Sequence, residues 1–422
     1  MSRVARHDKV NSLTKTASAP YTTVVVTMLR SVPEVCATFL ELGLTSFGGP
    51  IAHLGYIRRE CVEKRRWLSD DEYADIVALC QFLPGPASSQ VVFALGMHRA
   101  GFIGAVGASV AFLLPSAFAM IAFAYGVAKI GDLRGAGWLH GLKLAAVAVV
   151  AQAVWAMGVK LCPDRPRITI ALLAAACTLC VPGALGQIGV LLAGALAGWL
   201  LHRSLPAPPK PAHIERARGH LAAVAALLVF GALLFVPRIA ATATGSKALA
   251  VFDGFYRPGA LVFGGGHVVL PLLREAIVPR GWISDDAFLA GYGAAQAVPG
   301  PLFSFAGFLG AAIYRGKHAW LGGIWCLFAI FLPSWLLISG AFPFWHQVRA
   351  KAWMQAALRG ANAAVVGILL SALYSPVITE GVRNARDVAA ALVAFGLLQA
   401  WKAPPWAVVL MSAAAGQWLL IT

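Results

Sequence analysis

The chain has 422 residues, of which 59% are hydrophobic and only 12% are charged. A soluble globular protein of this length needs more charge on its surface, so the composition excludes that class and predicts an all-α polytopic membrane protein. The net charge of +16 comes from basic residues in short segments between apolar runs, which is typical of cytoplasmic loops and argues against a nucleic-acid partner.

Residues 1–30 are basic but contain no long apolar core and no small-residue cleavage site. We interpret them as a cytoplasmic basic arm and not as a signal peptide. Apolar runs of about the length of a membrane span follow, and with shorter interrupted runs they predict about 11–13 membrane segments, including broken or re-entrant helices. The clearest runs cover residues 102–127, 144–159, 185–201, 221–236, 320–342 and 389–421.

Several uncommon motifs occur twice in the same order. GLTSFGGP at 43–50 matches GALVFGGG at 259–266, and QFLPGP at 81–86 matches QAVPGP at 296–301. WLSDD at 67–71, LPS at 114–116 and Gly141 also recur as WISDD, LPS and Gly360. The offset is 259 − 43 = 216 at the first motif and 296 − 81 = 215 at the second, so the chain contains an internal repeat.

The repeat divides the chain. We predict a first repeat at 31–202, a Pro-rich basic linker at 203–219, an unpaired connecting membrane helix at 220–237 and a second repeat at 248–422. If each repeat crosses the membrane an even number of times, the unpaired helix turns the second copy upside down. The loop before Trp67 is richer in basic residues than the one before Trp282, which also favours inversion.

Each copy carries two Gly and Pro interruptions, in the first copy at 47–50 and 84–86. Glycine relaxes the limits on the backbone, and proline suits the first turn of a helix because that position needs no N–H. These segments therefore predict short helices whose N-termini present unpaired N–H groups to a polar cavity, which suits an oxyanion. Kinks between closely packed helices are the alternative reading.

Candidate ligands of the anion lie at these breaks. A tetrahedral dianion accepts hydrogen bonds and donates none, so hydroxyl, amide and backbone N–H groups suit it. The candidate substrate-binding residues are Gly48, Gly49, Pro50, Gln81, Gly85, Pro86, Ser88 and Ser89 in the first copy, and Gly264, Gly265, Gln296, Gly300, Ser304 and Arg257 in the second. Hydrogen bonding between helices is the alternative role for each polar side chain.

Four ionisable residues near the breaks are candidates for proton coupling, namely Glu41, His53, Asp75 and His267. Glu41 and Arg257 occupy matching positions of the repeat (257 − 41 = 216), so we expect these opposite charges to approach each other or to flank one cavity. The alternative is that such residues are interfacial anchors.

Other motifs have structural interpretations. Ser69 to Glu72 form a predicted capping box, and Ser284 begins the equivalent helix. Cys177 and Cys180 lie in an apolar run without His or acidic neighbours, which favours helix packing. Because the chain shows no nucleophile–base series, nucleotide-binding loop or metal-ligand cluster, we expect no enzyme activity, no cofactor and no metal.

The paired motifs at 47–50, 67–69 and 81–86 resemble the chromate ion transporter family in its two-domain form, from about residue 32 to the C-terminus. The resemblance implies a secondary transporter that exports chromate across the bacterial inner membrane, driven by the proton gradient or membrane potential, and confers chromate resistance. It also implies competition by sulfate. Gly266 and His267 replace Pro50 and Ile51, which leaves open whether both halves bind the anion.

Two other functions stay open. A sulfate or other tetrahedral oxyanion transporter, used for export or uptake, keeps the same fold. A membrane-embedded enzyme or receptor belongs to a different class and would need a polar catalytic cluster or a soluble sensory domain. The expected partners are the oxyanion and the lipid bilayer, and assembly into a homo-oligomer is left open.

Overall fold

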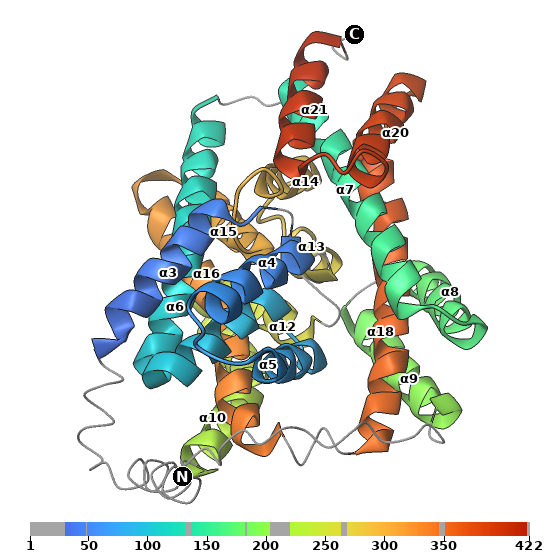
Figure 1. The fold of residues 1–422 in the computed structure, drawn as a ribbon. Coiled ribbons are helices and arrows are strands. Elements are labelled where there is room, and N and C mark those ends of the chain that lie inside the picture. The colour runs from blue at the N-terminus through green and yellow to red at the C-terminus, as the bar shows by residue number, and fades with distance from the viewer. Residues whose placement is uncertain are drawn as a thin grey trace, which may run out of the picture.

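The computed structural model describes residues 30–47, 49–130, 137–181, 184–202, 220–262, 268–345 and 351–419. Within these ranges the chain is helical and contains no strand, which confirms the all-α prediction (Figure 1). Residues 1–29 of the predicted arm and the predicted linker at 203–219 lie outside the described residues.

The first copy contributes α3 (Val32–Thr45), α4 (Gly49–Arg58), η2 (Arg59–Lys64), α5 (Asp70–Phe82), α6 (Ala87–Ile130), α7 (Gly137–Leu161), α8 (Arg165–Cys180) and α9 (Ala184–His202). Two further helices, α10 (His220–Leu233) and α11 (Val236–Thr244), precede the second copy. The second copy contributes α12 (Lys247–Leu261), α13 (Val269–Ile277), α14 (Asp285–Ala295), η4 (Leu302–Ser304), α15 (Phe305–Tyr314), η5 (Gly316–His318), α16 (Ala319–Ala341), η6 (Phe342–Phe344), α18 (Ala352–Ala372), η7 (Leu373–Ile378), α19 (Thr379–Gly381), α20 (Ala385–Gln399) and α21 (Pro405–Leu419).

Four helical stretches of the described chain are long and apolar enough to cross a membrane, or five if the bent pair α10 and α11 forms one span. The four stretches are Ala87–Ala128, Gly137–Leu161, Gly316–Phe344 and Ala352–Gly381. Most other helices are shorter, as expected for broken and re-entrant segments. The total of about 11–13 segments stays a prediction.

The order of elements repeats in the two copies. The helices α3, α4 and α5 correspond to α12, α13 and α14, and α7, α8 and α9 correspond to α18, α20 and α21. The long helix α6 is broken at Gly101, where φ is 65°, and Gly316, where φ is 68°, separates α15 from α16 (316 − 101 = 215). The sequence repeat is therefore also a structural repeat, and α10 and α11 have no counterpart among the described residues of the first copy.

Corresponding helices run in opposite directions. In Figure 1, α7 starts at the top beside α21, whereas α18 starts at the bottom beside α9. The close contacts agree, because Gly137 at the start of α7 packs on Gly416 near the end of α21, and Gly360 in α18 packs on Gly198 near the end of α9. Opposite directions of matching helices are the arrangement of inverted repeats.

The two copies are also interlocked. The helices α8 and α9 of the first copy pack on α18 of the second, and α20 and α21 pack on α7. Small residues at these crossings allow the backbones to approach closely, as is common between membrane helices. The contact between the copies is therefore extensive.

Polar caps fix where the shorter helices begin. Ser69 and Glu72 form the predicted capping box of α5, and the Ser284 hydroxyl accepts the Ala287 N–H at the start of α14. Hydrogen bonds from the backbone and side chain of Ser69 hold the pKa of Glu72 below its ordinary value. These caps satisfy N–H groups that have no partner within the helix.

Candidate functional site

Each Pro-Gly-Pro break hydrogen-bonds to a break in the opposite copy. The Gly85 N–H donates to the Val262 carbonyl at 2.7 Å, and the Gly300 N–H donates to the Ser46 carbonyl at 2.9 Å. Val262 follows the last turn of α12, and Ser46 follows the last turn of α3. Because 262 − 46 = 216 and 300 − 85 = 215, the two bonds are related by the repeat. The broken segments of both copies therefore meet at one interface.

The two glycines at these bonds have conformations that other residues rarely adopt. The φ angle is 132° at Gly85 and 99° at Gly300. A Cβ atom at Gly85 would lie 2.3 Å from Nε2 of Gln90 and 2.7 Å from Oγ of Ser334. A Cβ atom at Gly300 would lie 3.0 Å from Oγ of Ser116. Both positions therefore require glycine.

The serines of the repeated LPS motif reach the break of the other copy. Ser334 in α16 approaches Gly85 of the first copy, and Ser116 in α6 approaches Gly300 of the second. The sequence shows this motif twice but does not indicate a role for it. The structure adds both serines to the candidate site.

His53 holds the first break together. Its side chain is 1% exposed, with Nε2 3.2 Å from the Ser46 carbonyl and Nδ1 3.5 Å from the Ser88 hydroxyl. Because a carbonyl only accepts hydrogen bonds, Nε2 carries the proton and Nδ1 accepts from Ser88. A neutral ring satisfies both contacts, so His53 links two polar groups of the break, and its role in proton coupling stays a prediction.

Several buried polar atoms at the breaks have no hydrogen-bond partner among the described residues. Buried polar side chains in proteins are almost always paired, so such a cluster indicates that a polar ligand or water completes it. Three of the groups are hydroxyls and one is an amide N–H₂, and all four can donate to an anion. The atoms are Oγ of Ser46, Ser89 and Ser334, Nε2 of Gln296, and the acceptor Oε1 of Gln90.

For the other predicted ligands of the anion within the described residues, the structure shows the element in which they lie but no contact that indicates a role. Pro50 lies in the first turn of α4 and Pro86 directly precedes α6, as the sequence predicts for helix starts. Ser304 is buried in η4, whereas Gln81 is exposed at the end of α5. Gly49 begins α4, and Gly48, Gly264, Gly265 and His267 lie outside the described residues.

The expected approach of Glu41 and Arg257 is not what the structure shows. Arg257 Nε lies 2.5 Å from Oδ1 of Asp253, one turn earlier in α12, and Nη2 donates to the Leu234 carbonyl at 2.6 Å. Asp253 is buried, and Glu41 is exposed on α3. Side chains four residues apart on a helix are neighbours, so Asp253 pairs with Arg257 without any contact between distant parts of the chain.

The remaining ionisable residues near the breaks differ in burial and in pairing. Asp75 is buried in α5, and its role in proton coupling stays a prediction. Arg58 and Arg274, which match in the repeat, pair with the helix-start acids Asp70 and Asp285 at 2.7 Å. These two arginines therefore tie the break helices α4 and α13 to the following helices.

Two contacts between ionisable side chains of the two copies were not predicted from the sequence, and Asp286 is the one exposed member of the four. His140 Nε2 lies 2.8 Å from Oδ1 of Asp387, and Lys143, which is 3% exposed, pairs with Asp286. The acids belong to α20 and α14 of the second copy, and both bases belong to α7 of the first. The signal in the sequence was a histidine and a lysine within an apolar helix, where ionisable groups need partners.

A cavity of about 650 Å³ lies apart from the breaks, between the end of α6, the start of α14 and the end of α15. Arg315 lines it with a φ of 43° and has no acidic partner in the described part of the chain. Within the same residues no group of three or more His, Cys, Asp or Glu side chains could hold a metal ion. Arg315 therefore places a positive charge in a cavity between the two copies, apart from the breaks.

Comparisons with known proteins agree with the repeat. The model of a family described as chromate transporter matches residues 33–199 and 249–417, one segment in each copy. The chain is 29% identical over 412 residues to the chromate transport protein of Pseudomonas aeruginosa, covering 94% of this chain and 95% of that protein. It is also 29% identical to a probable chromate transport protein of Synechococcus elongatus, covering 92% and 95%, and to the chromate transport protein of Cupriavidus metallidurans, covering 84% of each. No solved structure matches the chain significantly.

Proposed function

The chain belongs to the chromate transporter family, and we propose that it is a secondary transporter that exports chromate through the interface between its two copies. It is a multi-pass protein of the inner membrane. Support for the substrate comes from the relatives named for chromate transport, which align over most of this chain. Support for the site comes from the reciprocal bonds that join Gly85 to the end of α12 and Gly300 to the end of α3.

The chemistry of the breaks suits an oxyanion. Chromate offers four oxygen acceptors and no donor at neutral pH, so it needs hydroxyl, amide and backbone N–H groups around it. Among the described residues the buried hydroxyls of Ser89 and Ser334 have no partner beside the first break, and Ser46 and Gln296 offer donors beside the second. In the proposal these four side chains donate hydrogen bonds directly to the bound anion.

The pair of reciprocal bonds offers a route to alternating access. Gly85 to Val262 and Gly300 to Ser46 join opposite copies at matching points. Rocking one copy against the other would lengthen one bond and preserve the other, and it would open the site to one side at a time. A bound anion that contacts both breaks would bias this equilibrium only through its different contacts in the two states.

The energetics favour export without an obligatory proton. Moving one charge across the membrane is worth about 2.3 kcal/mol per 100 mV, so a dianion leaving a negative interior gains about 4.6 kcal/mol per 100 mV. Proton coupling is a further part of the proposal. The proposed proton carriers are Glu41, His53, Asp75 and His267, and the buried bases His140 and Lys143 are further candidates. Export of this kind would confer chromate resistance.

Uptake of labelled chromate by everted inner-membrane vesicles tests the proposal. Vesicles that contain the protein should accumulate chromate when respiration makes their interior positive, and vesicles without it should not. A protonophore should collapse the accumulation, and excess sulfate should compete because it has the same shape and charge. Equal uptake with and without the protein would contradict chromate export, and sulfate uptake without chromate uptake would instead identify a sulfate transporter.

A further inference from the structure

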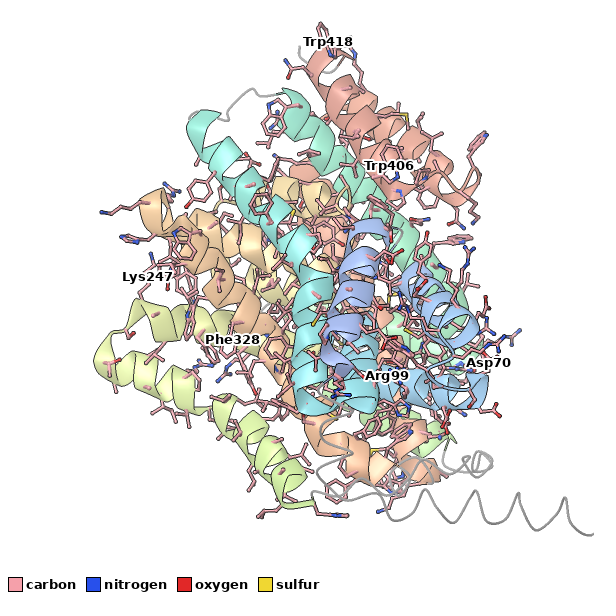
Figure 2. The ribbon with its side chains drawn as sticks, turned by 60° about the vertical axis from the view of Figure 1, so that its left-hand side comes forward. Asp70, Arg99, Lys247, Phe328, Trp406 and Trp418 are labelled. Atoms are coloured by element: carbon pink, nitrogen blue, oxygen red, sulfur yellow. The ribbon has the colours of Figure 1, made fainter. Side chains whose placement is uncertain are left out.

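An apolar groove lies on the outer face of the second copy, away from the breaks. It has a volume of about 640 Å³ and is lined along α16 by Leu321, Ile324, Trp325 and Phe328, and on the other side by Ala248 at the start of α12. Figure 2 shows the labelled Lys247 and Phe328 on the same side of the molecule, beside this groove. Leu321 and Ile324 are about half exposed, so the groove is open to the bilayer.

One end of the groove is basic. Lys247, Lys317 and His318 are exposed there, and Nζ of Lys247 lies 5.5 Å from the centre of the Tyr314 ring. No acidic residue occurs in 238–252 or 311–341, the two segments that form the groove and its basic end. In the described part of the chain, no ion pair neutralises Lys247 or Lys317. This end of the groove therefore carries uncompensated positive charge.

The rest of the groove has no free polar group to attract a soluble ligand. The indole N–H of Trp325 already donates to the Ala248 carbonyl at 3.1 Å. From His318 to Phe328 the helix rises about 15 Å, at about 1.5 Å per residue. That length is half of the roughly 30 Å hydrocarbon core, so the apolar part matches an acyl chain in one leaflet.

We propose that this groove binds one anionic phospholipid, with an acyl chain along α16 and its phosphate beside Lys247 and Lys317. The charge at the basic end selects an anionic headgroup over a zwitterionic one. A lipid held there bridges the start of α12 to the start of α16, next to the arginine-lined cavity. The proposal concerns the outer face alone and does not depend on which anion the transporter carries.

Native mass spectrometry of the delipidated protein tests this inference. Phosphatidylglycerol and phosphatidylcholine with identical acyl chains are titrated separately, and the first bound lipid is counted. We expect the wild type to bind phosphatidylglycerol more tightly. The paired change Lys247→Gln and Lys317→Gln should lower this affinity by about 25-fold, at about fivefold per lysine, and leave phosphatidylcholine binding unchanged.

Matched variants distinguish a loss of lipid binding caused by lost charge from one caused by misfolding. The exposed Lys160 on α7 is distant in sequence, and Lys160→Gln should bind both lipids as the wild type does. Changing Lys247 and Lys317 to Arg preserves the charge and should keep the preference. Ile324→Trp fills the groove and should weaken phosphatidylglycerol binding with both lysines present.

Three results would overturn the proposal. The first is equal affinity of the wild type for the two lipids, and the second is an unchanged preference in the doubly Gln-substituted protein. The third is displacement of phosphatidylglycerol by millimolar glycerol 3-phosphate, which would indicate a site for soluble phosphates. An unchanged melting temperature of the variants in detergent establishes that they are folded.

Discussion

Gly85→Ala tests the broken segment at its tightest point. The new Cβ would meet Nε2 of Gln90 at 2.3 Å and Oγ of Ser334 at 2.7 Å, and φ at this residue is 132°. Gln90 is the more flexible neighbour, but its amide donates to the Pro84 carbonyl at 2.7 Å, so moving it breaks a bond within the break. The change therefore disturbs Ser334, a proposed contact of the anion, and the Gln90 hydrogen bond within the break.

The expected cost follows from two contributions. A residue other than glycine at such a φ costs about 1–3 kcal/mol, and inserting a methyl group into a packed site costs about 1–3 kcal/mol more. A total of about 2–6 kcal/mol that falls on the transport-competent arrangement lowers flux by at least tenfold, because 1.4 kcal/mol corresponds to a factor of ten. Gly85→Leu should abolish transport. Gly300→Ala should be milder, since its nearest neighbour is 3.0 Å away.

The assay is chromate flux in proteoliposomes, normalised to the protein that is inserted. Gly55→Ala is the matched control, because a Cβ at Gly55 in α4 would meet no atom within 4 Å. It should transport as the wild type does. Wild-type flux and stability in the Gly85→Ala protein would refute the role of this break.

Three further predictions concern topology and charge. In a background without native cysteines, a cysteine at Arg66 and one at Arg280 should be labelled from opposite sides of the membrane; labelling from the same side would contradict inversion. Glu41→Gln should weaken the dependence of flux on an imposed pH gradient more than it weakens chromate binding, and unchanged dependence would remove Glu41 as the coupling residue. Arg257→Gln should destabilise the protein by about 3–5 kcal/mol, because it leaves the buried carboxylate of Asp253 unpaired, and Asp253→Asn in the same chain should restore the melting temperature. If the double variant also recovers wild-type flux, Arg257 is not a ligand of the anion.

The sequence predicts the features that depend on local spacing. Periodic apolar runs, the capping box at Ser69 and the glycine and proline breaks are local signals, and the structure has the helices and caps where these signals place them. The repeat can also be detected from the sequence alone, because the matching motifs recur at a constant offset. The inverted direction of the copies is predicted from one unpaired helix between repeats that each cross the membrane an even number of times, together with the unequal basic loops.

The contacts between the copies could not be predicted from local sequence patterns. Ser334 approaches Gly85, and His140 pairs with Asp387, across separations of more than 240 residues. No local pattern specifies which serine of a repeated motif reaches which break, because the interlocked packing decides it. Arg257 illustrates the opposite error: the repeat suggested a distant partner, whereas Asp253 on the same helix is nearer.

Counterflow of labelled chromate in proteoliposomes with the purified protein tests the central claim most directly. Liposomes preloaded with unlabelled chromate should take up the label through the wild-type protein, since exchange at one site needs no gradient. The paired change Ser89→Ala and Ser334→Ala removes two buried hydroxyls that have no partner in the described part of the chain. It should lower this exchange at least tenfold with little loss of stability. Wild-type exchange in that variant, or no exchange in the wild type, would contradict the account.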